Sequence, residues 1–154
     1  DTMAEIMWCG SLSHNNLTEC GRGKDFSVHK FGHALSAKYD VAHGASLSAV
    51  WGSWARYQCD AAPDRFAQYA KRVMGVGEEE GTLLEIAKKG IERTEAFFQK
   101  IGMPVSLAKL GVNPSDEDFW ELAMDATMGN TVRLSRLKPL SAKEVCEIYR
   151  MAKE

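Results

Sequence analysis

Residues 83–102, LLEIAKKGIERTEAFFQKIG, carry the clearest helical pattern in the sequence. Apolar and small side chains recur there at alternating spacings of three and four residues, which keeps them on one face of an α-helix. These positions are Leu84, Ala87, Ile91, Thr94, Phe98 and Ile101. Gly102 and the nearby Pro104 predict the end of this helix. The stretch indicates a fold built from amphipathic helices.

Similar patterns occur on both sides of this stretch. No segment shows sustained apolar–polar alternation, so no β-sheet is predicted. Helices are expected within residues 1–12, 25–39, 45–58, 63–74, 84–101, 113–130 and 140–154, with a polar loop at 13–23 and a short helical turn at 105–111. The sequence therefore predicts a single all-α domain of about seven helices that covers residues 1–154.

The charge and hydropathy of the chain exclude several classes of partner. The 19 basic and 21 acidic residues are mixed and give a net charge of −2, which does not suit nucleic acid or an anionic membrane. No apolar run approaches the roughly 18 residues of a membrane span, and no basic-then-apolar leader opens the chain. We therefore expect a cytoplasmic protein that binds neither membranes nor nucleic acid.

The cysteines and tryptophans suggest structural roles. The four cysteines, at positions 9, 20, 59 and 146, form no C-x-x-C pair. We expect reduced, mostly buried thiols without a zinc ribbon or a disulfide framework. The four tryptophans, at positions 8, 51, 54 and 120, occupy apolar positions of the expected helices. They are predicted to lie in the core.

Three of the four histidines lie in residues 29–44, HKFGHALSAKYDVAHG. His29 and His33 are four residues apart and share one helix face, whereas His43 follows a break between two helices. Imidazole is a common metal ligand and is well suited to proton transfer near neutral pH. Spacing alone favours His29 and His33 as a ligand pair, and it equally allows histidines that bind nothing. The fourth histidine, His14, is expected in a loop or at a helix end, without a functional role.

The same stretch resembles the signature of the iron-type (group III) alcohol dehydrogenases. In that signature a histidine is followed by Gly-His four residues later and by His-Gly ten residues after that. Three further stretches occur in the same order as in the butanol dehydrogenase and NADPH-dependent aldehyde reductase branch of this family. They are RFAQYAKRVMGV, AFFQKIGMPVSLAKLGV and LSAKEVCEIYRMAKE. The resemblance covers essentially the whole chain. It implies the C-terminal helical domain of a dehydroquinate synthase-like fold.

The resemblance also implies roles for the histidines. His29 and His43 match metal ligands, with iron or zinc as the expected ion, and His33 matches a catalytic histidine near the nicotinamide and substrate. In the family, an N-terminal dinucleotide-binding domain holds NAD(P), and the substrate is an alcohol or aldehyde. A homo-oligomer is expected for the full-length protein.

Two parts of the family's site are missing from this sequence. The family has two further ligands, an Asp and a His four residues later, upstream of this region. Asp25 and His29 have that spacing, but His29 is already assigned, and the glycine-rich diphosphate loop is also absent. We therefore expect the 154-residue chain alone to be inactive and to bind metal weakly or not at all.

Two other interpretations remain open at this stage. One is a non-catalytic helical assembly or interaction domain whose histidines bind no metal. The other is an HD-type phosphohydrolase, which is disfavoured because Gly44, not an aspartate, follows His43. An Asp-x-x-x-His and a glycine-rich dinucleotide domain upstream would favour the dehydrogenase.

Overall fold

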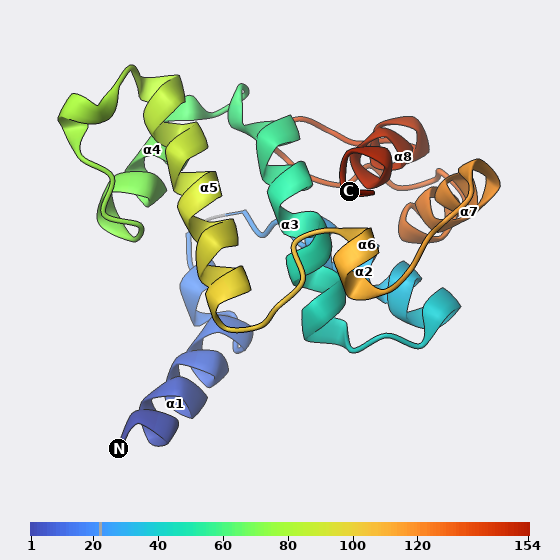
Figure 1. Cartoon of the computed structure of the whole chain (residues 1–154), viewed down its shortest axis with the longest axis horizontal. Coiled ribbons are helices and arrows are strands. Elements are labelled where there is room, and N and C mark those ends of the chain that lie inside the picture. The colour runs from blue at the N-terminus through green and yellow to red at the C-terminus, as the bar shows by residue number, and fades with distance from the viewer. Residues whose placement is uncertain (22) are drawn as a thin grey trace.

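The computed structural model describes residues 1–21 and 23–154, and this part of the chain is helical, without a β-strand. A single antiparallel bridge joins Leu134 to Leu140. The α-helices are α1 Thr2–His14, α2 Ser27–Tyr39, α3 His43–Cys59, α4 Pro63–Arg72, α5 Leu83–Lys100, α6 Leu107–Leu110, α7 Asp116–Ala126 and α8 Ala142–Met151 (Figure 1). Two short 3-10 helices, η1 Leu17–Glu19 and η2 Glu78–Glu80, complete the described elements.

The helices confirm the all-α prediction, with boundaries that shift by a few residues. The expected turn at 105–111 is the short helix α6, which brings the described α-helices to eight. The expected loop at 13–23 contains the end of α1 and η1, and its residue 22 lies outside the described residues. No helix of the described part is both long and apolar enough to cross a bilayer.

Side chains at the helix starts explain several of these boundaries. Thr82 and Ser141 each accept a hydrogen bond from the first helical turn, and a glutamate three residues later bonds back to the cap backbone. Ser115 and Asp118 form the same arrangement at the start of α7. Such capping boxes satisfy N–H groups that the helix itself leaves unpaired.

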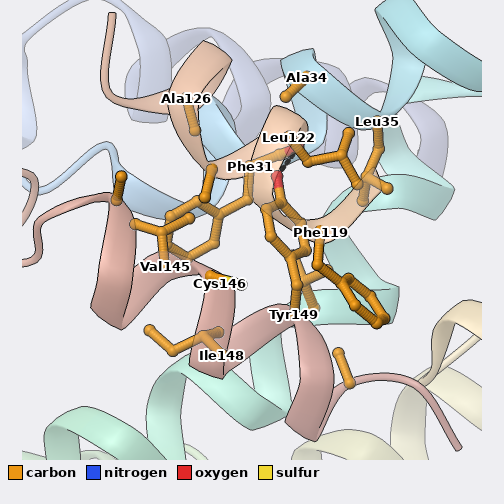
Figure 2. Packing of buried hydrophobic residues seen from close by; sticks show 14 of the residues in the cluster. Phe31, Ala34, Leu35, Phe119, Leu122, Ala126, Val145, Cys146, Ile148 and Tyr149 are labelled. Carbon is orange, nitrogen blue, oxygen red and sulfur yellow. Dashed lines mark hydrogen bonds between the residues drawn. The ribbon is translucent and has the colours of Figure 1, made fainter. Parts of the chain in front are cut away.

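The main core lies between α2, α7 and α8 (Figure 2). Phe31 and Leu35 of α2 are fully buried, as are Leu122 of α7 and Tyr149 of α8. The Tyr149 hydroxyl donates a 2.9 Å hydrogen bond to the carbonyl oxygen of Phe31, so α8 is fixed directly to the α2 turn that carries the histidines. Burial without a partner would make this hydroxyl costly.

A second packing unit consists of α4 and α5, joined to the rest by α3. At Gly90 a Cβ atom would lie 2.4 Å from the Cβ of Ala70, so the two helices meet where glycine faces alanine. Ala55 and Cys59 of α3 are buried together with Ile91 of α5. Helix α3 therefore connects the α4–α5 pair to the main core.

The burial of two tryptophans and two cysteines differs from the prediction. Trp8 is 62% exposed because α1 buries none of its residues, and Trp120 is 48% exposed on the outer face of α7. Trp51 and Trp54 are half-buried. All four cysteines are free thiols, as expected, but Cys9 and Cys20 are exposed and only Cys59 and Cys146 are buried.

The buried hydroxyl of Tyr149 gives a direct test of the core. Tyr149→Phe should lower the free energy of unfolding by about 1–2 kcal/mol, because the hydrogen bond to Phe31 is lost. The matched control is Tyr39→Phe, since the Tyr39 hydroxyl is buried without a hydrogen-bond partner. That variant should be neutral or slightly stabilised. Urea unfolding measures both, and equal effects would contradict the role of the Tyr149 bond.

An ion pair links α2 to α7. The Lys38 ammonium lies 2.7 Å from a carboxylate oxygen of Asp118, and the Ser115 backbone N–H donates to the same carboxylate at 2.8 Å. Lys38 and then Ser115 hold the pKa of Asp118 well below its ordinary value. A carboxyl with a lowered pKa stabilises the fold above its unfolded pKa, about 4, and this stabilisation is lost as the pH falls through the folded pKa.

Asp118→Asn should therefore weaken the fold at pH 7 and make its acid sensitivity shallower. The expected result is a lower free energy of unfolding at pH 7 and a smaller decrease between roughly pH 5 and pH 2. Urea titrations at several pH values measure this dependence. Glu117→Gln, on the exposed surface of the same helical turn, is the control and should change the slope less. An unchanged slope in Asp118→Asn would refute the linkage.

Candidate metal centre

Three histidines from two helices meet at one end of α2 and α3. His29 lies in the first turn of α2, His33 one turn later, and His43 is the first residue of α3. The ring centroids are 5.2 Å apart for His29 and His43, and 5.0 Å apart for His33 and His43. His29 contacts His43 directly, although almost the whole of α2 separates them along the chain.

The spacing of the imidazole nitrogens suits one metal ion. One ligand atom from each histidine lies within 4.8 Å of the others. Among the described residues, no carboxylate belongs to this cluster. Nδ1 of His29 and Nε2 of His43 are 3.2 Å apart and form a hydrogen bond whose donor depends on the tautomers. Two imidazole nitrogens bound at about 2.0–2.1 Å to a tetrahedral ion would lie roughly 3.3 Å apart. The His29–His43 pair therefore fits a shared ion with little movement.

The close approach of α2 and α3 creates this arrangement. A Cβ atom on Gly32 would lie 2.6 Å from Leu47 and 2.8 Å from the Ser46 hydroxyl. That hydroxyl donates to the carbonyl oxygens of Gly32 and His43, at 3.2 Å and 2.7 Å. His29 precedes Gly32 by three residues and His43 precedes Ser46 by three, so both imidazoles lie about one turn from the contact.

The surroundings favour neutral imidazoles. Partial burial, followed by the neighbouring His43 and His14, lowers the pKa of His29. Burial and then His43 likewise lower the pKa of His33. A histidine must be neutral to bind a metal, so both shifts leave the lone pairs available at neutral pH.

The fourth histidine also lies near the cluster. His14 is the last residue of α1, which is one of the two places expected for it. Its ring meets that of His29 edge-on, with centroids 5.8 Å apart. The Phe26 ring stacks on the ring of His29 with centroids 4.1 Å apart and also meets the His14 ring edge-on. No pattern in the sequence predicted this contact, because the polar loop between His14 and Asp25 has no helical or strand periodicity.

The only carboxylate with the family's Asp-x-x-x-His spacing is used elsewhere. One oxygen of Asp25 accepts hydrogen bonds from the backbone and hydroxyl of Ser27, at 3.0 Å and 2.5 Å. The other oxygen accepts from the Ser135 hydroxyl at 2.5 Å. Asp25 thus bonds to the first residue of α2 and ties it to a distant loop. It does not supply a carboxylate to the histidine cluster.

The fold and the cluster together define an all-α domain with three histidines placed close enough to hold a metal ion. Residues 17–153 match the model of the Fe-containing alcohol dehydrogenase family, C-terminal. The chain belongs to this family, which confirms the resemblance that its sequence motif indicated. Membership in the family favours the dehydrogenase interpretation over the interaction domain and the phosphohydrolase.

Several known proteins are similar to this chain. NADH-dependent butanol dehydrogenase A of Clostridium acetobutylicum is 29% identical over 97% of this chain and 38% of its own length. NADPH-dependent aldehyde reductase YqhD of Escherichia coli is 30% identical over 75% of this chain and 29% of its own length. The crystal structure of NADH-dependent butanol dehydrogenase A of Thermotoga maritima superimposes with a TM-score of 0.84 at 30% identity, covering 96% of this chain and 38% of that one. The chain thus spans less than two-fifths of these relatives.

The packing at Gly32 predicts how the cluster responds to one added methyl group. Gly32→Ala should lower the free energy of unfolding by about 1–3 kcal/mol, because the crowding outweighs the better helix propensity of alanine. Gly44→Ala is the matched control, since its Cβ would meet only Met103 at an ordinary 3.8 Å. It should be neutral or stabilising. Thermal unfolding measures the stability of both variants. A stabilised Gly32→Ala variant would show that α2 and α3 are not closely packed at this position.

Proposed function

We propose that this chain is the C-terminal, metal-binding part of a metal-dependent, NAD(P)-linked alcohol dehydrogenase or aldehyde reductase. The observation that carries the proposal is the 3.2 Å contact between the His29 and His43 nitrogens, in a chain of this family. The names of the relatives support alcohols and aldehydes as the substrate class. A cytoplasmic location and a homo-oligomeric full-length protein belong to the same proposal.

The three histidines have two different roles in this proposal, metal binding and proton transfer. His29 and His43 bind a divalent ion, iron or zinc, whose ordinary ligands include imidazole. When bound, such an ion polarises the alcohol or carbonyl oxygen as a Lewis acid, while NAD(P) accepts or supplies the hydride. His33 remains exposed to solvent beside the pair, and its ring stacks on that of His43 at 5.0 Å. This position suits a residue that passes a proton between the substrate oxygen and water.

The rest of the site comes from outside this chain. Two imidazoles leave a divalent ion short of the four ligands that it usually takes. The described residues offer no carboxylate to the cluster, because Asp25 accepts its hydrogen bonds from Ser27 and Ser135. The N-terminal dinucleotide-binding domain of the full-length protein, together with the missing Asp and His ligands, would complete the site.

Variants of the full-length protein separate the two roles. His43→Ala should remove the metal and lower kcat/KM by at least about 100-fold, since even residues that only orient metal ligands contribute 10–100-fold. His33→Ala should keep the metal and lower kcat by roughly 100- to 10,000-fold, with a changed pH profile. Metal analysis and steady-state kinetics measure both. A His43→Ala enzyme with full metal content would refute the ligand assignment.

The isolated 154-residue chain gives the complementary test. It should show no dehydrogenase activity with NADH or NADPH, and titration with Zn²⁺ or Fe²⁺ should detect weak binding or none. Activity of this chain alone would contradict the proposal, as would tight binding of one metal ion per chain.

A further inference from the structure

Phe26, the residue just before α2, stacks on the imidazole of His29. The centroids of the two rings are 4.1 Å apart, and their planes differ by 13°. Phe26 is the N-cap residue of α2 and His29 follows three residues later, so the helical turn brings the two side chains together. One of the two histidines assigned to the metal thus packs against an aromatic ring.

This stacking takes the place of the hydrogen bond that usually orients a metal-binding histidine. Such a histidine almost always donates the N–H of its other ring nitrogen to a carboxylate, a carbonyl oxygen or water. Nδ1 of His29 lies 3.2 Å from Nε2 of His43, and among the residues that the structure describes Nε2 of His29 has no protein hydrogen-bond partner. The nearby Asp25 carboxylate is bonded to Ser27 and Ser135. The orientation of the His29 ring therefore depends on packing.

Phe26 is itself held in place. Asp25, the residue before it, ties the chain to the loop of Ser135. The carbonyl oxygen of Phe26 accepts a 3.1 Å hydrogen bond from the backbone N–H of Lys30. The ammonium of Lys24 lies 4.4 Å from the centroid of the Phe26 ring, and a cation at this distance is attracted to the π electrons. A ring fixed in this way can hold the ring that stacks on it.

His14, at the end of α1, adds a second aromatic contact. Its ring meets the Phe26 ring edge-on at 6.4 Å and the His29 ring edge-on at 5.8 Å. Stacked and edge-to-face arrangements are the two geometries that aromatic rings prefer. Rotation of the His29 imidazole about its side-chain bonds would disturb the contacts with both neighbouring rings. Its present orientation is therefore favoured over the others.

We propose that Phe26 is a positioning residue of the metal site, which holds the His29 imidazole with one nitrogen facing His43. Ordering a ligand side chain before the ion binds reduces the conformational entropy that binding costs. Phe26 acts through His29 and touches neither the ion nor the substrate. The inference rests on the proposed function, because it needs His29 and His43 to be metal ligands.

The metal affinity of the full-length protein tests this role. Phe26→Leu removes the ring but keeps an apolar side chain, whereas Phe26→Tyr keeps a ring that can stack. Each protein is stripped of metal, and its dissociation constant for Zn²⁺ is measured by competition with a chromophoric chelator. Phe26→Leu should raise this constant about 10-fold, at the lower end of the effects of groups that orient metal ligands. Phe26→Tyr should stay within about 3-fold of the wild type, because stacking is retained.

Phe66→Leu is the matched control. Phe66 is half-buried like Phe26, but it lies on α4 and packs against Trp54, with centroids 6.3 Å apart. This variant loses a comparable aromatic contact, so its stability should fall while its affinity for Zn²⁺ stays unchanged. An unchanged affinity in Phe26→Leu would overturn the proposal. Equal weakening in the two leucine variants, or in Phe26→Leu and Phe26→Tyr, would also overturn it.

A crystal structure of the metal-loaded wild-type protein gives a second test that needs no variant to fold. The Phe26 ring should still stack on the metal-bound His29, and a ring turned away from His29 would contradict the positioning role. The two levels of the account also fail separately. Tight Zn²⁺ binding by the wild type with an unchanged Phe26→Leu refutes the positioning role alone, whereas a full-length wild type that binds no Zn²⁺ refutes the proposed function and this inference with it.

Discussion

The close contact between α2 and α3 at Gly32 is the constraint on which the site depends. Only a residue without a side chain lets Leu47 and Ser46 approach the α2 backbone this closely. The same contact sets His29 and His43 at hydrogen-bonding distance, although they belong to different helices. At the preceding residue of α2, the buried Tyr149 hydroxyl donates a hydrogen bond to the Phe31 carbonyl. Contacts with both α3 and α8 thus position the turn of α2 that carries the histidines.

Much of the fold could be predicted from the sequence, because helical periodicity and capping residues are local signals. The spacing of apolar residues such as Ile91 and Thr94 predicted the position of α5, and the Ser141–Glu144 pair predicted the start of α8. Burial was harder to predict. Trp8 has the apolar neighbours of a core residue, but its helix finds no surface to pack against in this chain. Whether an apolar side chain is covered depends on tertiary contacts that periodicity does not contain.

The histidine site, too, could be predicted only as far as local sequence patterns reach. The i, i+4 spacing correctly placed His29 and His33 on one face, and the family motif added His43. The direct contact of His29 with His43 depends on the crossing of α2 and α3, which no local pattern reveals. The approach of His14 and Phe26 to His29 depends on the path of an irregular loop. The division of roles among the three histidines still rests on the resemblance and stays a prediction.

The central claim is that His29 and His43 jointly hold a metal ion in the full-length enzyme. Anomalous diffraction from crystals of the metal-loaded full-length protein, collected at the iron and zinc absorption edges, tests it most directly. We predict a peak between His29 and His43, at about 2.0–2.2 Å from one nitrogen of each, with His33 outside the coordination shell. A peak bound to His29 and His33 without His43, or a peak away from the cluster, would contradict the claim.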